Sequence, residues 1–236
     1  MSTIRLFVPG PLVAGTSIEL DEARAHYLGR VMRRSEGDPV ELFDGRSGGF
    51  AGRIAEIARR RVSIDLIAKL RDLPERNTAP VLFQAVIKRP RLEWLVEKAT
   101  ELDVGTIVPV RTRRVAAPLG RVERLATIAM EAAEQSGRLD VPEIAGETIL
   151  ADIGSLRRSG RSLLVLDPTA EARVADLAAL HCGDLDILVG PEGGLAAEDE
   201  VELAQMPQVV RGRIAPTILR AETAALAGLA ALAMLH

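Results

Sequence analysis

The residues best suited to bind a small ligand lie in a glycine-rich turn directly after an apolar run. Leu185-Asp186-Ile187-Leu188-Val189 is followed at once by Gly190-Pro191-Glu192-Gly193-Gly194. Glycine has no Cβ, so it can adopt a positive φ and lets a ligand contact main-chain N–H and C=O groups. In α/β proteins ligands bind at the carboxyl ends of strands, where such a turn would lie. The alternative is a plain tight turn between a strand and a helix.

A second candidate site opens the last apolar segment, Ile218-Leu219-Arg220-Ala221-Glu222-Thr223-Ala224. It follows an expected strand over residues 209–213 and a short loop that contains Pro216. The first turn of a helix has free N–H groups, which can bind an anion or a carboxylate. In the alternative interpretation, Glu222 or Thr223 merely caps its own helix.

Two further polar motifs accompany these turns. One is Gln84-Ala85-Val86-Ile87-Lys88, and the other is Glu131-Ala132-Ala133-Glu134-Gln135-Ser136-Gly137-Arg138. As a pattern alone, the polar residues of the second motif are also consistent with the solvated face of a helix.

Arginine and lysine residues gather in four clusters. A guanidinium group is a planar fork of donors that matches phosphate, although most surface clusters are simply solvated. Two of the clusters come just after expected strands, which favours a phosphate-binding face. The clusters are Arg24, Arg30, Arg33 and Arg34; Arg59, Arg60 and Arg61; Lys88, Arg89 and Arg91; and Arg111, Arg113 and Arg114.

The chain changes character between Leu73 and Pro80. Before this linker, short β-like runs alternate with turn signals, which is typical of a small β-barrel. We expect strands over residues 4–8, 17–20, 39–43, 49–57 and 61–68 and a helix over 23–31. After it, strands over 81–87, 106–111, 162–167, 185–189 and 209–213 alternate with helices such as 91–103 and 121–136. This alternation predicts an α/β domain with a mostly parallel sheet.

Composition excludes several classes of protein. The 236 residues are 47% hydrophobic and 27% charged, with a net charge of −3 that gives no global attraction to nucleic acid. Cys182 is the only cysteine, which rules out an intrachain disulfide and favours the cytoplasm. We expect no signal peptide, and the apolar run from Ala224 to Leu235 is too short to span a membrane. The three histidines and Cys182 have no metal-ligand spacing, so no metal is expected.

Taken together, the four motifs resemble those of the RsmE-type 16S ribosomal RNA uridine-N3 methyltransferases of the SPOUT superfamily. The resemblance runs from Arg5-Leu6-Phe7 nearly to the end of the chain. It implies a PUA-like β-barrel over residues 1–73 that binds RNA. A SPOUT α/β methyltransferase domain over residues 78–236 would follow, with a C-terminal trefoil knot. It also implies a cytoplasmic homodimer that acts on 16S rRNA or the small ribosomal subunit.

The resemblance further implies which residues form the site. S-adenosylmethionine would be held by main-chain groups of three loops, 166–168, 189–194 and 214–220. From the chemistry of methyl transfer to uracil N3, we expect Arg220 to stabilise an anion or hold a phosphate and Glu222 to act as a base or orienting group. The cofactor-binding residues would be Leu166, Val189, Gly190, Pro191, Glu192, Gly193, Gly194, Ile214, Ile218, Leu219 and Thr223. The RNA-binding residues would be Arg5, Arg24, Arg30, Arg33, Lys88, Arg89, Arg113 and Arg138.

The chain departs from the family pattern at two places. It has Asp103 where the family has glycine in Glu-Leu-Gly-Val, and Ile214-Ala215-Pro216-Thr217 where the family has Leu-Gly-x-Arg. Ala215 can follow the same path only if its φ is negative. Two rival functions stay open: methylation at another RNA position such as a ribose 2′-oxygen, and a non-catalytic RNA-binding assembly factor. Trp94 is expected to pack in the core rather than to stack on bases.

Overall fold

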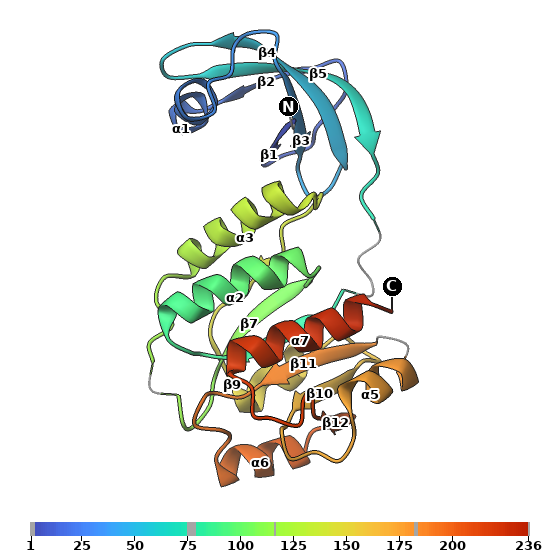
Figure 1. Cartoon of the computed structure of the whole chain (residues 1–236). Coiled ribbons are helices and arrows are strands. Elements are labelled where there is room, and N and C mark those ends of the chain that lie inside the picture. The colour runs from blue at the N-terminus through green and yellow to red at the C-terminus, as the bar shows by residue number, and fades with distance from the viewer. Residues whose placement is uncertain (1–2, 75–78, 116, 182–183, 236) are drawn as a thin grey trace. The chain divides into compact units, whose positions relative to one another are not determined.

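The computed structural model describes residues 3–74, 79–115, 117–181 and 184–235, and the chain divides into two compact units (Figure 1). The first unit comprises residues 1–75 and 133–141, and the second comprises residues 76–132 and 142–236. The chain therefore returns to the first unit once, over residues 133–141. The expected domains, 1–73 and 78–236, were two continuous segments and did not include this return.

The first unit is a PUA-like half-barrel. Its sheet has the hydrogen-bonded order β1-β3-β4-β5-β2, in which β1 runs parallel to β3 and the other neighbours are antiparallel. The inward residues of these strands, among them Leu6, Leu42, Ile54 and Ile64, form one core. The strands are β1 (Ile4–Phe7), β2 (Ser17–Leu20), β3 (Pro39–Phe43), β4 (Gly49–Ile57) and β5 (Val62–Arg71).

The helix expected over residues 23–31 forms as two pieces. Helix α1 (Glu22–His26) begins at Asp21, whose carboxylate accepts a hydrogen bond from the Arg24 N–H. It continues into a π-helical turn, η1 (Tyr27–Val31), in which the Met32 N–H donates to the carbonyl of Tyr27. Such π-turns are uncommon and cannot be recognised from a periodicity of 3.6.

Arg5 secures the returning segment within the first unit. Its guanidinium donates to the carbonyl oxygens of Ala133, at 3.1 Å, and Arg138, at 2.6 Å, and it pairs with Glu41 at 3.1 Å. Glu134, which is 7% exposed, accepts a hydrogen bond from the Phe7 N–H and pairs with Arg24. These contacts are internal to the fold, so the solvated-face interpretation is wrong for Glu134.

Asp44 organises the loop after β3. It is 5% exposed and accepts hydrogen bonds from the N–H groups of Leu12 (3.0 Å), Arg46 (2.8 Å) and Ser47 (2.6 Å). Burial alone would raise the pKa of Asp44, but the hydrogen bonds from Ser47, Arg46 and Leu12 outweigh it and lower that pKa.

Replacing Asp44 with asparagine should destabilise the protein by about 2 kcal/mol, because the new NH₂ group must face one of these N–H donors. Because folding lowers the pKa of Asp44, its ionised carboxylate stabilises the wild-type protein. This stabilisation is fully present above the unfolded-state pKa of about 3.9, and it is lost as the pH falls through the folded-state pKa. Urea denaturation as a function of pH measures both effects. Asp72→Asn, whose side chain is 90% exposed, is the control and should change stability by less than about 0.5 kcal/mol. Equal stability of the two variants would contradict the assignment.

The second unit is an α/β domain built on a parallel sheet of order β12-β10-β11-β6-β7-β8, with β9 also pairing with β7. Strands β6 and β11 are buried along their whole length, as expected of strands covered on both faces. Its strands are β6 (Val81–Ala85), β7 (Thr106–Arg111), β8 (Glu143–Ile144), β9 (Thr148–Ile149), β10 (Ser162–Leu166), β11 (Leu185–Val189) and β12 (Val209–Gly212). Its helices are α2 (Arg89–Glu101), α3 (Val122–Ser136, whose last turn belongs to the first unit), η2 (Leu150–Asp152), α4 (Ile153–Leu156), α5 (Val174–Leu180), α6 (Ala197–Ala204) and α7 (Ala221–Ala233).

Helices α2 and α7 lie side by side on one face of this sheet (Figure 1). Helix α7 comes close to the strands at Gly228, where an added Cβ would lie 3.1 Å from Leu166 and 3.2 Å from Ile187. The alternate residues of the strands, such as Val165 and Leu188, pack on the other face with Ile153 of α4 and Leu203 of α6. Both faces of the sheet are therefore covered, and ligands can reach it only at the ends of the strands.

Asp103 takes over the role of the glycine that the family pattern has at this position. It follows the last turn of α2 with a φ of 66°, and the Val104 N–H donates to the carbonyl of Ala99. This left-handed helix end favours glycine, but aspartate tolerates it better than most residues. None of the helices in the described part of the chain is both long and apolar enough to cross a membrane.

Candidate active site

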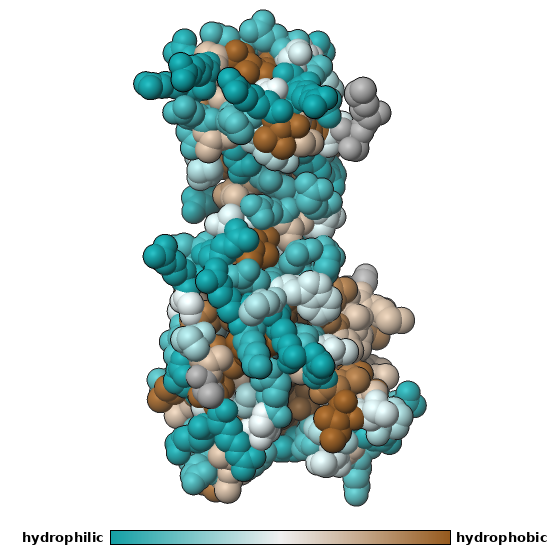
Figure 2. All heavy atoms as spheres, turned by 60° about the vertical axis from the view of Figure 1, so that its left-hand side comes forward, coloured by the Kyte–Doolittle hydropathy of each residue, from teal (hydrophilic) through white to brown (hydrophobic). Residues whose placement is uncertain are grey.

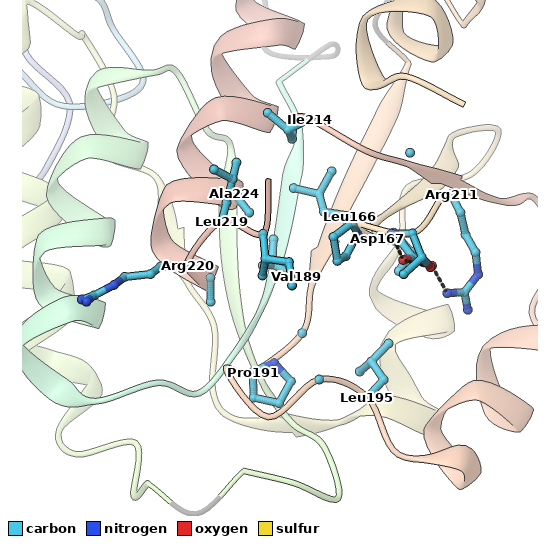
Figure 3. Close-up of a pocket in the computed structure, with 18 of the residues that line it drawn as sticks. Leu166, Asp167, Val189, Pro191, Leu195, Arg211, Ile214, Leu219, Arg220 and Ala224 are labelled. Carbon is cyan, nitrogen blue, oxygen red and sulfur yellow. Dashed lines mark hydrogen bonds and ion pairs between the residues drawn. The ribbon is translucent and has the colours of Figure 1, made fainter. Parts of the chain in front are cut away.

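A cavity of about 540 Å³ opens at the carboxyl ends of β10, β11 and β12, beside the start of α7 (Figure 3). This volume lies within the range of ordinary small-molecule sites. Its apolar wall contains Val165, Leu166, Val189, Pro191, Leu195, Ile214, Ile218, Leu219 and Ala224. Its polar lining contains Asp167, Thr169, Glu192, Glu200, Arg211, Thr217 and Arg220.

The glycine-rich turn after β11 forms one side of the cavity. Gly194 has a φ of 70°, and its N–H donates to the carbonyl of Pro191 at 2.9 Å. Arg114, from the loop after β7, donates to the carbonyl of Gly193 at 2.9 Å. The turn is thus fixed from outside while main-chain atoms of Gly190 and Gly194 stay beside the cavity.

A charged cluster of Asp167, Arg211 and Glu200 also lines the cavity. Figure 3 shows the ion pair of Asp167 and Arg211 on the side away from Arg220. Asp167 accepts hydrogen bonds from Thr169 (2.8 Å from its N–H, 2.6 Å from its hydroxyl) and from Arg211 at 3.0 Å. Burial opposes ionisation of Asp167, but these hydrogen bonds prevail and lower its pKa. Arg211 also pairs with Glu200. Asp167 and Glu200 share the single guanidinium of Arg211, which leaves this wall with an excess of negative charge that favours a cationic ligand.

Arg220 and Glu222 lie at the start of α7. Arg220 is the residue before the first helical turn, and it is exposed at the rim of the cavity with its side chain directed away from Leu166 and Val189 (Figure 3). Glu222 is only 7% exposed, and its Oε1 lies 3.6 Å from the Nε of Arg91. The side chain of Arg220, the N-cap residue, makes no capping hydrogen bond, and among the described residues neither the Glu222 nor the Thr223 side chain donates or accepts a hydrogen bond at the start of this helix, so the capping role considered from the sequence is absent.

The structure brings the expected cofactor-binding residues together around this one cavity. All except Gly193 and Thr223 line it. Sequence reasoning missed Glu200, Arg211 and Gly212, since α6 and β12 carry no local ligand-binding signal. Ala224 also lines the cavity; it belongs to the segment marked as a candidate site, although it was not expected to bind the cofactor. Sequence reasoning also missed Arg91, although the cluster Lys88, Arg89 and Arg91 marked its position.

The expected RNA-binding residues differ in how free their side chains are. Arg138 is buried and Arg5 is partly buried, both in contacts within the first unit, and Arg138 pairs with Asp140 at 3.1 Å. Arg24 is partly exposed and pairs with Glu134. In the second unit, Arg89 pairs with Glu93 and Arg113 with Glu202. The exposed members of the set are Arg30, Arg33, Lys88, Arg89 and Arg113.

Trp94 is 46% exposed, so its assignment to the core is wrong: it lies on the outer side of α2, while Leu92, Leu95 and Val96 face inward.

Ala215 is not among the described residues with a positive φ, so it meets the condition for replacing the family's glycine. Both Ala215 and Thr217 line the cavity.

Comparisons with known proteins agree with this geometry over nearly the whole chain. Residues 74–233 match the model of an RNA methyltransferase domain, and residues 20–67 match that of an RNA methyltransferase PUA domain. The chain is 30% identical to Ribosomal RNA small subunit methyltransferase E of Rickettsia conorii, covering 98% of this chain and 95% of that protein. It is 28% identical to the Bacillus subtilis protein of the same name, covering 88% and 86%.

Among solved structures, the chain resembles a Ribosomal RNA small subunit methyltransferase E from Neisseria gonorrhoeae bound to S-adenosyl methionine. The TM-score is 0.90 at 25% identity, and the likeness covers 99% of this chain and 98% of that one. The sheet order, the two matched domains and the full-length relatives thus point to one assignment. The chain belongs to the RsmE family of 16S ribosomal RNA methyltransferases, with a PUA domain and a SPOUT methyltransferase domain.

Proposed function

We propose that this protein methylates N3 of a specific uridine in 16S ribosomal RNA, using S-adenosylmethionine. The observation that carries the proposal is the cavity at the ends of β10, β11 and β12, which combines bare main chain with Arg220 at its rim. Glu222, next to that rim, supplies a buried carboxylate. The family relationship supports the same reaction.

The lining fits S-adenosylmethionine in shape and in charge. The apolar side chains of Leu166, Val189 and Leu219 suit a flat purine, and the main chain of the glycine turn can bond its edge. The excess of carboxylates suits a ligand with a positive sulphur. When bound, the cofactor supplies an electrophilic methyl group. The resemblance also implies a trefoil knot around the segment 214–220, and we include this knot in the proposal.

The protein's own residues must make uracil N3 nucleophilic, because it carries a proton at neutral pH. Arg220 would stabilise the negative charge that develops on the uracil ring, as a preorganised cation does in other active sites. Glu222 would accept or orient the N3 proton, since its Oε2 is buried and has no hydrogen-bond partner among the described residues. The uridine must leave its stack to reach these groups.

We further propose a homodimer that works in the cytoplasm, where its ribosomal substrate is made. The last helix supports a subunit contact: Met234 is 86% exposed and Leu235 44%, and Leu180 of α5 is 76% exposed. Figure 2 shows that hydrophilic side chains cover most of one face of the molecule and that hydrophobic ones gather in a few patches. Exposed apolar patches of this kind often mark interaction sites.

We also propose that the exposed basic residues of each unit, Arg30 and Arg33 in the first and Lys88, Arg89 and Arg113 in the second, contact RNA phosphates. Contacts of this kind position an RNA without reading its sequence. Arg5 and Arg138 would support this surface from within the fold.

The decisive experiment is mass-spectrometric mapping of modified nucleosides in 16S rRNA and in small subunits after incubation with the protein and labelled cofactor. We expect a single labelled 3-methyluridine. A label on a ribose 2′-oxygen would replace the proposal with a different methyltransferase, and cofactor binding without any label would leave an RNA-binding factor.

Replacing Ala224 with phenylalanine should block the cavity and weaken S-adenosylmethionine binding by at least roughly tenfold, because Ala224 lines the cavity from α7. Titration calorimetry measures the affinity directly. Ala233→Phe, at the exposed end of the same helix, is the matched control and should bind as the unaltered protein does. Equal affinities of the two variants would show that the ligand binds elsewhere.

A further inference from the structure

Arg91 joins two segments that line or border the cavity. It belongs to the first turn of α2, where its Nη1 lies 3.1 Å from Oε1 of Glu192 and its Nε lies 3.6 Å from Oε1 of Glu222. Glu192 is part of the glycine-rich turn, and Glu222 is in the first turn of α7. Two different nitrogens of one planar group thus reach two carboxylates on separate elements.

The surroundings of the three side chains make this contact more than a surface ion pair. Arg91 is 32% exposed, Glu192 40% and the side chain of Glu222 only 9%. A carboxylate buried to this degree is costly unless a cation or a donor faces it. Arg91 is the cation that the structure gives Glu222, and it meets only Oε1, so Oε2 stays free to accept a proton or a hydrogen bond.

The glycine-rich turn depends on side chains from outside it. Arg114 holds the carbonyl of Gly193, and Arg91 holds the side chain of Glu192. Of these two, Arg91 also reaches α7. A shift of Arg91 would therefore move the turn and the start of α7 relative to each other, and both border the same cavity (Figure 3).

We propose that Arg91 is a positioning residue that links the glycine-rich turn to the start of α7, and so sets both the width of the cofactor cavity and the orientation of the Glu222 carboxylate. The proposal rests on the proposed function only in taking the cavity as the S-adenosylmethionine site. Lysine cannot replace Arg91 fully, because a single ammonium nitrogen cannot occupy the positions of both Nη1 and Nε.

The test measures binding rather than methyl transfer. The probe is S-adenosylhomocysteine in titration calorimetry, because its sulphur is uncharged and its affinity reports the shape of the cavity rather than attraction to Glu192. Arg91→Ala should weaken binding about tenfold, and Arg91→Lys should recover part of the loss. Lys98→Ala is the matched control: Lys98 lies on the same helix, its side chain is 33% exposed against 32% for Arg91, and it pairs with Glu101 at 2.8 Å, so its loss should leave the affinity unchanged.

A double-mutant cycle with Glu192→Gln separates positioning from a general loss of structure. If Arg91 acts through Glu192, the affinity of the double variant for S-adenosylhomocysteine should be close to that of whichever single variant binds more weakly. The losses of affinity caused by the two substitutions are then not additive. Additive effects, or an Arg91→Ala variant that binds as Lys98→Ala does, would overturn the inference. If Arg91→Ala does not fold, the same cycle is run with Arg91→Lys.

The same data distinguish this inference from the proposed function. An unaltered protein that binds neither S-adenosylhomocysteine nor S-adenosylmethionine would sink both. An unaltered protein that binds, with the expected coupling between Arg91 and Glu192, supports the inference even if the methylated nucleotide proves to be another.

Discussion

Replacing Arg220 with alanine should slow methyl transfer to ribosomal RNA by roughly 10²–10³-fold, the usual cost of losing a group that stabilises a developing anion. Arg220 lies at the rim of the cavity, and its guanidinium extends away from the apolar wall (Figure 3). The expected defect therefore falls on the chemical step, while the affinity for S-adenosylmethionine changes only a few-fold.

Single-turnover methylation with saturating cofactor measures this rate, and calorimetry on the same samples measures cofactor binding. Arg213→Ala is the matched control. Arg213 lies, like Arg220, in the loop between β12 and α7, but it does not line the cavity. Arg220→Lys should retain part of the rate through its charge. A wild-type rate for Arg220→Ala would remove this residue from the mechanism.

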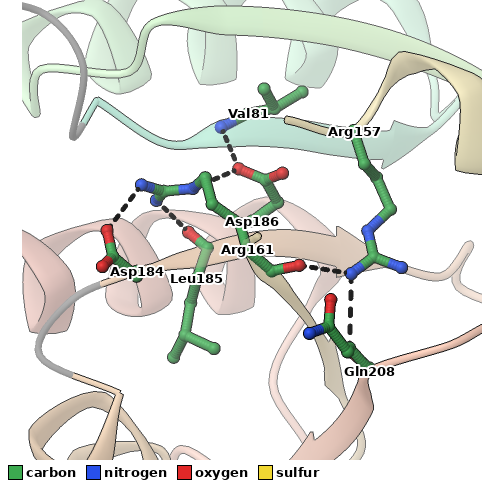
Figure 4. A network of polar contacts seen from close by, with 7 residues as sticks. All are labelled: Val81, Arg157, Arg161, Asp184, Leu185, Asp186 and Gln208. Carbon is green, nitrogen blue, oxygen red and sulfur yellow. Dashed lines mark hydrogen bonds and ion pairs between the residues drawn. The ribbon is translucent and has the colours of Figure 1, made fainter. Parts of the chain in front are cut away.

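Replacing Asp186 with alanine should lower the free energy of unfolding by about 3–5 kcal/mol, because it leaves the buried guanidinium of Arg161 without its buried counter-charge. Asp186, on β11, is fully buried, and its Oδ1 accepts hydrogen bonds from the Val81 N–H and from Nε of Arg161, both at 3.0 Å (Figure 4). Arg161 is 5% exposed and also donates to the carbonyl of Leu185 at 2.7 Å. These bonds join the starts of three neighbouring strands, β6, β10 and β11.

Urea denaturation followed by the fluorescence of Trp94, the only tryptophan, reports on this unit of the protein. Asp184→Ala is the control: Asp184 pairs with the same arginine, but its side chain is 59% exposed, so the change should stay within about 1 kcal/mol. The double variant Asp186→Leu with Arg161→Met should regain much of the stability, since it removes both charges. A loss below about 1 kcal/mol for Asp186→Ala would mean that water already solvates this network.

The sequence predicts most of the strands to within a few residues. Runs such as 185–189 and 106–111 are apolar, short and bounded by turn residues, so local pattern and tertiary structure agree. The two-residue strands β8 and β9 carry no such pattern, because they form only where β7 offers an edge. The exposure of Trp94 and the burial of Glu134 depend on which segments pack against them, which is a long-range property.

In the candidate site, too, the sequence predicts the parts that carry a local signal and misses those that depend on long-range packing. The loops around residues 166–168, 189–194 and 214–220 could be predicted because glycine, proline and strand ends mark them locally. Glu200 and Arg211 reach the site from α6 and β12 through long side chains, and no local pattern marks such a reach. The basic cluster around Arg91 marked its position but not its contacts with Glu192 and Glu222. The departure at Asp103 needed the structure as well, since only the observed φ of 66° shows how the helix ends without glycine.

The return of residues 133–141 to the first unit has a practical consequence for anyone who wishes to study the RNA-binding module alone. A fragment cut at residue 74 would lack Ala133 and Leu139, which pack on Phe43. It would also leave Arg5 without its carbonyl acceptors, which belong to Ala133, Glu134 and Arg138. Such a fragment would expose to solvent the aromatic rings of Phe7 and Phe43, which this cluster covers in the full chain. A minimal module has to carry residues 133–141 on an engineered connection, and any natural exchange of this module between proteins would have to transfer two separate stretches of gene.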